Sequence, residues 1–207
     1  MEANFKHTRL LAAVMFVDIV GYTAIMQKNE REAVRMRSLL RLVIERQLPQ
    51  HEGRLVQYYG DGALGFFKSA MEAVNAAVKI QDELKKHTVP VRIGLHQGEI
   101  VHTREGIYGS AVNIASRIEA LAQAGSILIS EKIYVEIQNQ TDLKFREAGN
   151  FGLKNVDGPL KLYSLTDTTA APFREEIMKR WQHLKFLQVR TALVRPYLSN
   201  TNPALLN

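Results

Sequence analysis

Two aspartates stand where a buried strand ends or turns. Asp18 closes the apolar run of residues 10–17, and Asp61 lies in a Gly-Asp-Gly turn between RLVQYY and ALGFF. Singly, each has an ordinary structural explanation, because Asp18 can cap an Asx-type turn and Gly-Asp-Gly is common turn chemistry. Together, a strand end and a neighbouring hairpin tip can bring two carboxylates to one place. Mg²⁺ binds one or two protein carboxylates plus phosphate oxygens, so the pair predicts metal-dependent phosphoryl chemistry.

The loop after Asp18 offers backbone groups for phosphate. It contains a glycine and turns toward a helix, and amides in such a loop or helix start can bind phosphate oxygens. We therefore expect a triphosphate to contact these residues: Ile19, Val20, Gly21, Tyr22 and Thr23.

A polar stripe lies on a predicted helix further along the chain. Ser110, Asn113 and Arg117 are spaced i, i+3 and i+7, so they share one helix face. An amide and a planar cation one turn apart can bind a sugar oxygen and a phosphate. The alternative is a solvated helix face. The stripe continues into Ala120 and Ala124, which argues against a general solvated face.

The rest of the pattern mixes strands and helices without a regular βαβ repeat, which predicts an α+β domain with a largely antiparallel sheet. Apolar residues at helical spacing predict amphipathic helices, with Ser69 as the cap of the second. The expected helices cover residues 29–51, 69–86, 108–124 and 131–138. The expected strands cover residues 10–17, 54–59, 63–67, 91–102 (as a strand pair or one bent strand), 126–130, 143–149 and 159–165.

Bulk composition narrows the class of protein. The 207 residues, 46% of them hydrophobic, suit one globular domain with a substantial core. No apolar run approaches the roughly 20 residues of a membrane span, and no signal-peptide pattern is present, so we expect a cytoplasmic protein. The absence of cysteine excludes disulfides, thiolate catalysis and cysteine-based zinc sites. The formal charge of +6 comes without a basic block interleaved with aromatics, so nucleic-acid binding is not expected.

The composition changes near residue 166. TDTTAAP is typical of a linker, and a basic helical segment comes next over residues 174–194. That segment could dock on the core, pair with a partner helix, or begin something beyond this chain; a solvated connecting helix is the ordinary alternative. We predict a domain over residues 1–166, then a linker and C-terminal helical segment over residues 167–207.

Five segments, taken in order across residues 10–165, resemble the motifs of the class III nucleotidyl cyclases: FVDIVGYT, QYYGDGALGFF, VRIGLHQGEIV, GIYGSAVNIASRIEALA and GNFGLKNVDGPLKLYSL. The resemblance implies a ferredoxin-like palm fold and a head-to-tail homodimer whose active sites draw on both chains. It also implies that a nucleoside triphosphate, ATP in most of the family, is closed to its cyclic monophosphate with release of pyrophosphate. Two Mg²⁺ or Mn²⁺ ions serve that reaction.

The resemblance also assigns roles to single residues. Asp18, Asp61 and the backbone carbonyl of Ile19 match the metal ligands. Asn113 and Arg117 match the pair that orients the ribose and stabilises charge on the α-phosphate, supplied by the opposite protomer. Lys154 is a triphosphate contact by rough motif position.

Two positions that read the base depart from the adenylate cyclase pattern. Gln57 stands where those enzymes commonly have lysine, and Gly106 where they have aspartate, threonine or serine. Gln57 can still donate or accept, whereas Gly106 offers only its backbone. ATP, GTP and other triphosphates therefore stay open as substrates. A dimerising or nucleotide-sensing module without turnover is disfavoured, because such a relic has no chemical need to keep both aspartates and the Asn–Arg pair.

Overall fold

The protein, described here by a computed structural model over residues 8–153, 156–165 and 173–190, is built around one eight-stranded sheet. Its strands are β1 (Thr8–Ile19), β2 (Arg54–Tyr59), β3 (Gly62–Phe67), β4 (Val91–His102), β5 (Ile107–Tyr108), β6 (Ile127–Ser130), β7 (Phe145–Gly152) and β8 (Pro159–Leu165). The order is β2-β3-β1-β4-β6-β8-β7, with β5 beside β4. Only β4 and β6 pair in parallel; the other pairings are antiparallel. The expected α+β class with a mostly antiparallel sheet is confirmed.

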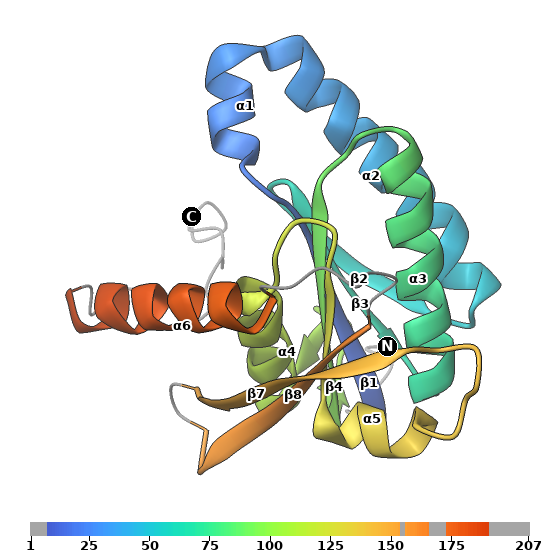
Figure 1. Cartoon of the computed structure of the whole chain (residues 1–207). Coiled ribbons are helices and arrows are strands. Elements are labelled where there is room, and N and C mark those ends of the chain that lie inside the picture. The colour runs from blue at the N-terminus through green and yellow to red at the C-terminus, as the bar shows by residue number, and fades with distance from the viewer. Residues whose placement is uncertain (1–7, 154–155, 166–172, 191–207) are drawn as a thin grey trace, which may run out of the picture.

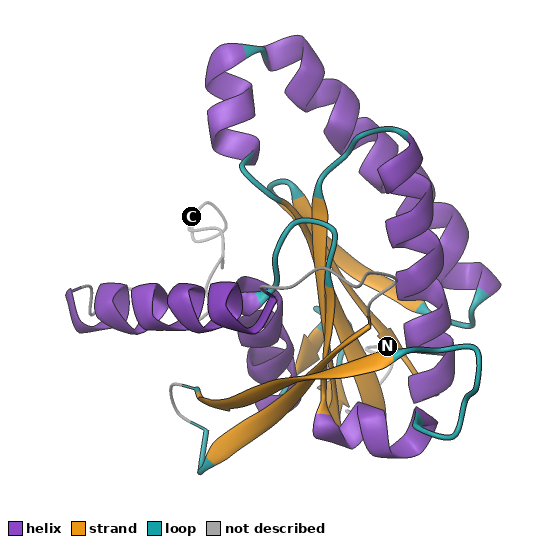
Figure 2. Cartoon of the chain, viewed as in Figure 1, coloured by secondary structure: helices purple, strands orange, loops and turns teal. Residues whose placement is uncertain are grey.

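Helices cover both faces of this sheet (Figures 1 and 2). They are α1 (Tyr22–Lys28), α2 (Glu30–Gln50), α3 (Ala70–Lys86), α4 (Ser110–Leu121), α5 (Glu131–Ile137) and α6 (Phe173–Arg190). The apolar sides of α2, α3 and α5 join one core cluster with the sheet. Two further clusters bring α4 and α6 against the sheet's other face. The predicted cap of α3 is present, since Ser69 Oγ accepts from the Glu72 amide at 3.3 Å.

Of the two alternatives for residues 91–102, the single strand is observed, because β4 pairs with β1 along its whole length. Two other local expectations differ from the structure. The third predicted helix is shorter than expected, because Ile107 and Tyr108 are used in β5 and Ala122 is extended. The turn expected after Asp18 leads into a separate helix, α1, before α2 begins.

Close packing of α4 on β4 depends on glycine. A Cβ added at Gly94 would overlap the backbone nitrogen and Cα of Glu119, and one at Gly98 would lie 2.9 Å from the Ala111 Cβ. Both glycines sit in the middle of the sheet, where a side chain would lift the helix away. These two positions therefore set how near α4 lies to the sheet.

We expect Gly94→Ala to lower the free energy of unfolding by about 1–3 kcal/mol, because the added methyl meets helix backbone and not a flexible side chain. Urea unfolding of the two proteins measures the difference. Gly152→Ala is the matched control, since nothing lies within 4 Å of a Cβ added there. Equal losses of stability in both variants would contradict this view of the α4–β4 contact.

Candidate active site

The structure brings Asp18 and Asp61 together, as predicted, where the neighbouring strands β1 and β3 end and begin. Asp18 lies near the end of β1, where its Cα pairs with Gly62 of β3, and Asp61 immediately precedes Gly62. Burial, followed by the charge of Asp18 and a hydrogen bond with it, raises the pKa of Asp61 to about 6. Two acids held this close repel each other when both are ionised. A divalent cation would relieve that repulsion, so the pair fits a Mg²⁺ or Mn²⁺ site.

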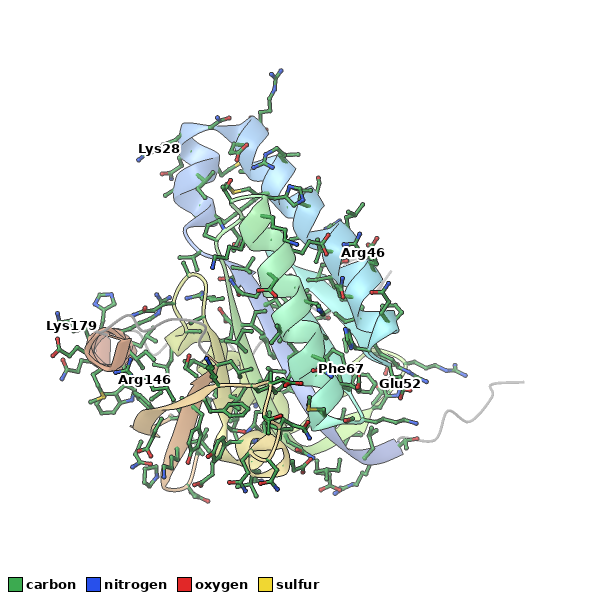
Figure 3. The ribbon with its side chains drawn as sticks, turned by 45° about the vertical axis from the view of Figure 1, so that its right-hand side comes forward. Lys28, Arg46, Glu52, Phe67, Arg146 and Lys179 are labelled. Carbon is green, nitrogen blue, oxygen red and sulfur yellow. The ribbon has the colours of Figure 1, made fainter. Side chains whose placement is uncertain are left out.

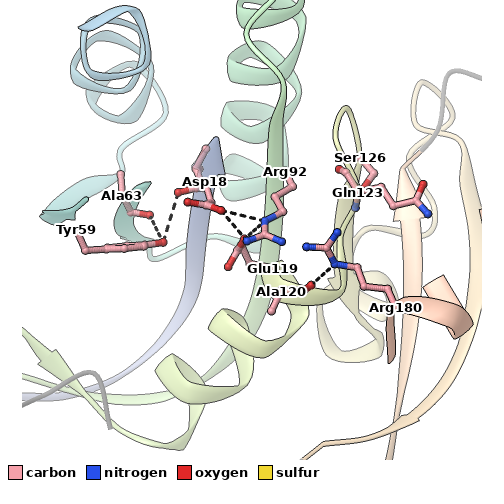
Figure 4. Close-up of polar contacts among 10 residues, drawn as sticks. Asp18, Tyr59, Ala63, Arg92, Glu119, Ala120, Gln123, Ser126 and Arg180 are labelled. Carbon is pink, nitrogen blue, oxygen red and sulfur yellow. Dashed lines mark hydrogen bonds and ion pairs between the residues drawn. The ribbon is translucent and has the colours of Figure 1, made fainter. Parts of the chain in front are cut away.

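Arg92, which the sequence analysis did not single out, supplies a fixed cation at this place. It lies directly opposite Asp18 in the β1–β4 register. Its guanidinium donates to Asp18 Oδ2 from Nη2 at 2.6 Å and from Nε at 3.1 Å (Figure 4). Both side chains are only 17% exposed. Water therefore screens the pair weakly, and Arg92 holds the Asp18 carboxylate in one orientation.

Glu119, on the last turn of α4, forms an ion pair with the same guanidinium (Figure 4). Its side chain is 9% exposed. Burial raises the pKa of Glu119 to about 7, while the positive charge of Arg92 acts in the opposite direction. Arg92 is thus held between a carboxyl of β1 and a carboxyl of α4. We call Asp18, Arg92 and Glu119 the charged bridge.

Tyr59 supports the hairpin that carries Asp61. Its hydroxyl lies 3.4 Å from the Val17 carbonyl oxygen and 3.3 Å from the Ala63 carbonyl oxygen, to which it donates. Its ring also packs on Phe16, with 5.5 Å between ring centroids. Tyr59 therefore joins β1 to the hairpin next to the two aspartates. The roles of Tyr59 and Arg92 both depend on how distant strands pair, so the residues next to them in the sequence do not indicate these roles.

The loop after Asp18 supplies fewer free amides than expected. Ile19 has a core side chain that is 1% exposed, so only its backbone is available to a ligand. The Val20 amide is already used, because it donates to the Pro90 carbonyl oxygen at 2.7 Å. Gly21 adopts a left-handed conformation with φ of 76° and leads into Tyr22 and Thr23, the first residues of α1. The Gly21 carbonyl oxygen accepts from the Ile25 amide at 3.1 Å, whereas the amides of residues 21–23 have no acceptor among the described residues and suit phosphate.

Asn113 and Arg117 lie on α4, but not on the side that faces the charged bridge. Glu119 comes two residues after Arg117, which is about 200° around the helix. Glu119 is buried toward the sheet, whereas Asn113 is exposed. Burial lowers the pKa of Arg117, which is partly covered. Within the described ranges, no hydrogen bond or ion pair joins either residue to Asp18 or Asp61.

The two expected base-reading positions lie near each other. Gln57 is exposed on β2. The loop before β5 approaches the same strand, because a Cβ added at Gly106 would lie 3.6 Å from Val56 Cγ1, beside Gln57. That loop is held by the Thr103 amide, which donates to the Gly106 carbonyl oxygen at 2.8 Å. Lys154, the remaining expected contact, falls outside the described residues.

A mostly antiparallel sheet with paired carboxylates at the strand ends fits a domain that carries out metal-dependent phosphoryl chemistry. The family described as adenylate and guanylate cyclase catalytic domain matches residues 7–167, and the chain belongs to that family. Its resemblance to class III cyclases, drawn from the sequence motifs, is confirmed.

Relatives and solved structures agree with this membership. A Rhizobium meliloti protein whose name assigns it to the adenylate cyclases is 31% identical over 165 residues, which are 75% of this chain and 28% of that protein. An adenylate cyclase of Mycobacterium tuberculosis is 28% identical over 69% of this chain and 37% of its own length. The chain thus spans well under half of these relatives. The structure of an adenylate/guanylate cyclase/hydrolase from Silicibacter pomeroyi matches with a TM-score of 0.73 and 28% identity, covering 79% of this chain and 100% of that one.

The helices described here do not include one that is both long and apolar enough to span a membrane.

Proposed function

We propose that this domain converts a nucleoside triphosphate, ATP by preference, to the 3′,5′-cyclic monophosphate and pyrophosphate. The observation that carries the proposal is the contact between Asp18 and Asp61 beside the cationic Arg92. Such a site binds divalent cations and the phosphates that accompany them. The proposal places the domain over residues 1–166 and in the cytoplasm, with the remaining residues as an appended segment.

Asp18, Asp61 and the Ile19 carbonyl would hold two Mg²⁺ or Mn²⁺ ions in this proposal. When bound, such ions acidify the ribose 3′-hydroxyl and offset charge on the triphosphate. Arg92 keeps the Asp18 carboxylate turned into the site. The backbone of residues 21–23 and the side chain of Lys154 would contact the phosphates. Bound ions of this kind would take the place of a dedicated protein base, so no further side chain is assigned to that role.

Asn113 and Arg117 would act on the substrate of a second copy of the chain. Their helix turns Glu119 toward its own charged bridge and leaves Asn113 exposed. An exposed amide and a partly covered guanidinium on the same side of α4 suit the ribose and the α-phosphate bound by the partner chain. A homodimer with two shared sites results, since each chain supplies the metal ligands of one site and the Asn–Arg pair of the other.

Adenine is the favoured base, and guanine is the alternative. The names of the relatives support ATP. Gln57 fits either purine, because its amide both donates and accepts hydrogen bonds. Gly106 lies beside the same strand and adds no side chain to choose between them. Selection between the bases is therefore expected to be weaker than in a site with two polar side chains.

The function is tested by incubating the purified chain with ATP, GTP, CTP or UTP in the presence of Mn²⁺ or Mg²⁺. Products are identified by mass. We expect a cyclic monophosphate and pyrophosphate, mainly from ATP. A cyclic product from GTP alone would replace the base assignment and keep the reaction. Dimeric protein that yields no cyclic product would favour a nucleotide-sensing module without turnover.

A further inference from the structure

The last turn of α4 is capped by the Ala122 amide, which donates to the Ile118 and Glu119 carbonyl oxygens, but it has no cation of its own. It contains no basic residue, and the acidic Glu119 lies there instead. The final carbonyl groups of a helix lack partners inside the helix and carry partial negative charge, so an acid in that turn is unfavourable. The start of α4 is also weakly held, because Gly109 provides no side-chain cap. The position of this helix therefore depends on the elements that pack against it.

The C-terminal helix α6 supplies the missing group. Arg180 Nε donates to the Ala120 carbonyl oxygen at 2.6 Å, in the last turn of α4 (Figure 4). A cation at a helix C-terminus stabilises it by completing a carbonyl hydrogen bond and opposing the helix dipole. Ala120 belongs to the residues that continue the polar stripe of α4. The part of α4 that follows Arg117 is therefore in contact with α6. Of the alternatives considered for the C-terminal segment, docking on the core is the one observed over residues 173–190.

Apolar contacts hold α6 in this place. Ile177 is completely buried and joins Ile118 and Leu121 of α4 in one core cluster. Trp181 packs against Phe151 with 6.3 Å between ring centroids, and its indole nitrogen donates to the Gly152 carbonyl oxygen at 3.1 Å. By contrast, Lys179 is exposed on the side of α6 that faces away from the body of the chain (Figure 3). One face of α6 is therefore part of the core.

Arg180 also acts electrostatically on the charged bridge. Its positive charge lowers the pKa of Glu119, although burial has the larger effect in the opposite direction. In return, burial and then the charge of Arg92 lower the pKa of Arg180. Arg180 is thus near enough to Arg92 and Glu119 for their charges to interact. The end of α6, the end of α4 and the carboxylate site form one continuous set of contacts.

We propose that α6 is a positioning element for the cyclase site, with Arg180 as its positioning residue. By binding the Ala120 carbonyl and covering the last turn of α4, it fixes the helix that presents Arg117 outward and Glu119 inward. The inference rests on the proposed cyclase function. Undocking of α6 would lower turnover without altering the substrate, the metal ligands or the base-reading positions.

The test compares full-length wild type with Arg180→Ala, Arg180→Lys and the control Lys179→Ala. Trp181 is the only tryptophan in the chain, so its emission maximum reports whether α6 is docked. We expect kcat of Arg180→Ala to fall by about 10- to 100-fold with little change in KM, as for a small misplacement of catalytic groups. Arg180→Lys should recover part of kcat, because it keeps a cationic donor. Lys179→Ala should match the wild type.

A second variant keeps the test decisive if Arg180→Ala leaves α6 docked. Ile177→Asp places a charge in a fully buried apolar contact and should release the helix, seen as a red shift of Trp181 emission. A released helix with unchanged kcat would overturn the proposal. Stabilisation by Mn²⁺ should persist in these variants, because their metal ligands are intact.

Failure of the cyclase assignment would look different. In that case the wild type makes no cyclic nucleotide. Hydrogen exchange across residues 110–121 then tests the contact by itself: faster exchange in Arg180→Ala supports positioning of α4 by α6, and unchanged exchange in a chain with released α6 refutes it.

Discussion

Asp61→Asn is expected to abolish metal-dependent turnover while leaving the fold at least as stable as the wild type. Loss of a metal carboxylate should cost several kcal/mol of transition-state stabilisation, on the order of 10³-fold in rate. Stability should not suffer, because burial and Asp18 raise the pKa of Asp61 from 3.8 to about 6. A raised pKa means that the ionised form opposes folding above pH 6, and asparagine removes that charge. Rate measurements and urea unfolding at pH 8 check the two halves of this prediction.

Metal binding gives a readout that does not depend on turnover. Mn²⁺ should raise the Tm of the wild type, since a ligand that binds only the folded state stabilises it, and this shift should vanish in Asp61→Asn. Asp82→Asn is the matched control, because Asp82 is an exposed acid on α3. Full activity in Asp61→Asn, or a Mn²⁺ shift equal to that of the wild type, would remove Asp61 from the metal site.

Asp18→Asn makes an instructive contrast. It should lose activity to a similar extent, but Asp18 is the partner of Arg92 through two hydrogen bonds. Its replacement leaves Arg92 partly buried, with Glu119 as the remaining carboxylate of the charged bridge. Because only Asp18 is an ion-pair partner of Arg92, we expect Asp18→Asn to have a lower free energy of unfolding than Asp61→Asn.

The sequence allowed the meeting of the two aspartates to be predicted but did not require it. A buried run that ends in an acid and a Gly-Asp-Gly hairpin are local patterns, whereas the pairing of β1 with β3 joins strands that α1, α2 and β2 separate in the chain. The structure pairs Asp18 with Gly62, the residue after Asp61. Alternating and helical spacing likewise predicted most strands and helices, since these patterns depend on neighbours within a few residues.

Arg92 and Glu119 could not be predicted in the same way. Arg92 is one of 27 basic residues, and its role appears only when the β1–β4 register places it opposite Asp18. Glu119 reads as an ordinary helix-surface acid until Gly94 allows α4 to lie against the sheet. For α6, the spacing of Ile177, Trp181 and Leu184 was a signal for docking, but the spacing alone did not identify α4 as the surface that it covers.

Mixing two inactive variants should restore activity if the sites are shared. Asp61→Asn removes a metal ligand, and Arg117→Ala removes the cation proposed for the partner's substrate, so each homodimer is impaired at both sites. In a mixed dimer, one site carries both changes and the other carries neither. With equal amounts and free exchange, about a quarter of wild-type activity should return, because half the dimers are mixed and each has one intact site. Turnover measured before and after mixing checks this.

The amount of activity regained on mixing distinguishes a site shared between two chains from a site built within one chain. A site built within one chain gives no gain on mixing, since every chain then carries one defect in its own site. Mixing Asp61→Asn with Asp18→Asn is the control, because both changes affect the same set of ligands and no combination yields an intact site. Recovery in the first mixture and none in the second would agree with the outward direction of Asn113 and Arg117 on α4, opposite to the inward Glu119. If neither mixture recovered activity, Arg117 and Asp61 of one chain would have to belong to the same active site.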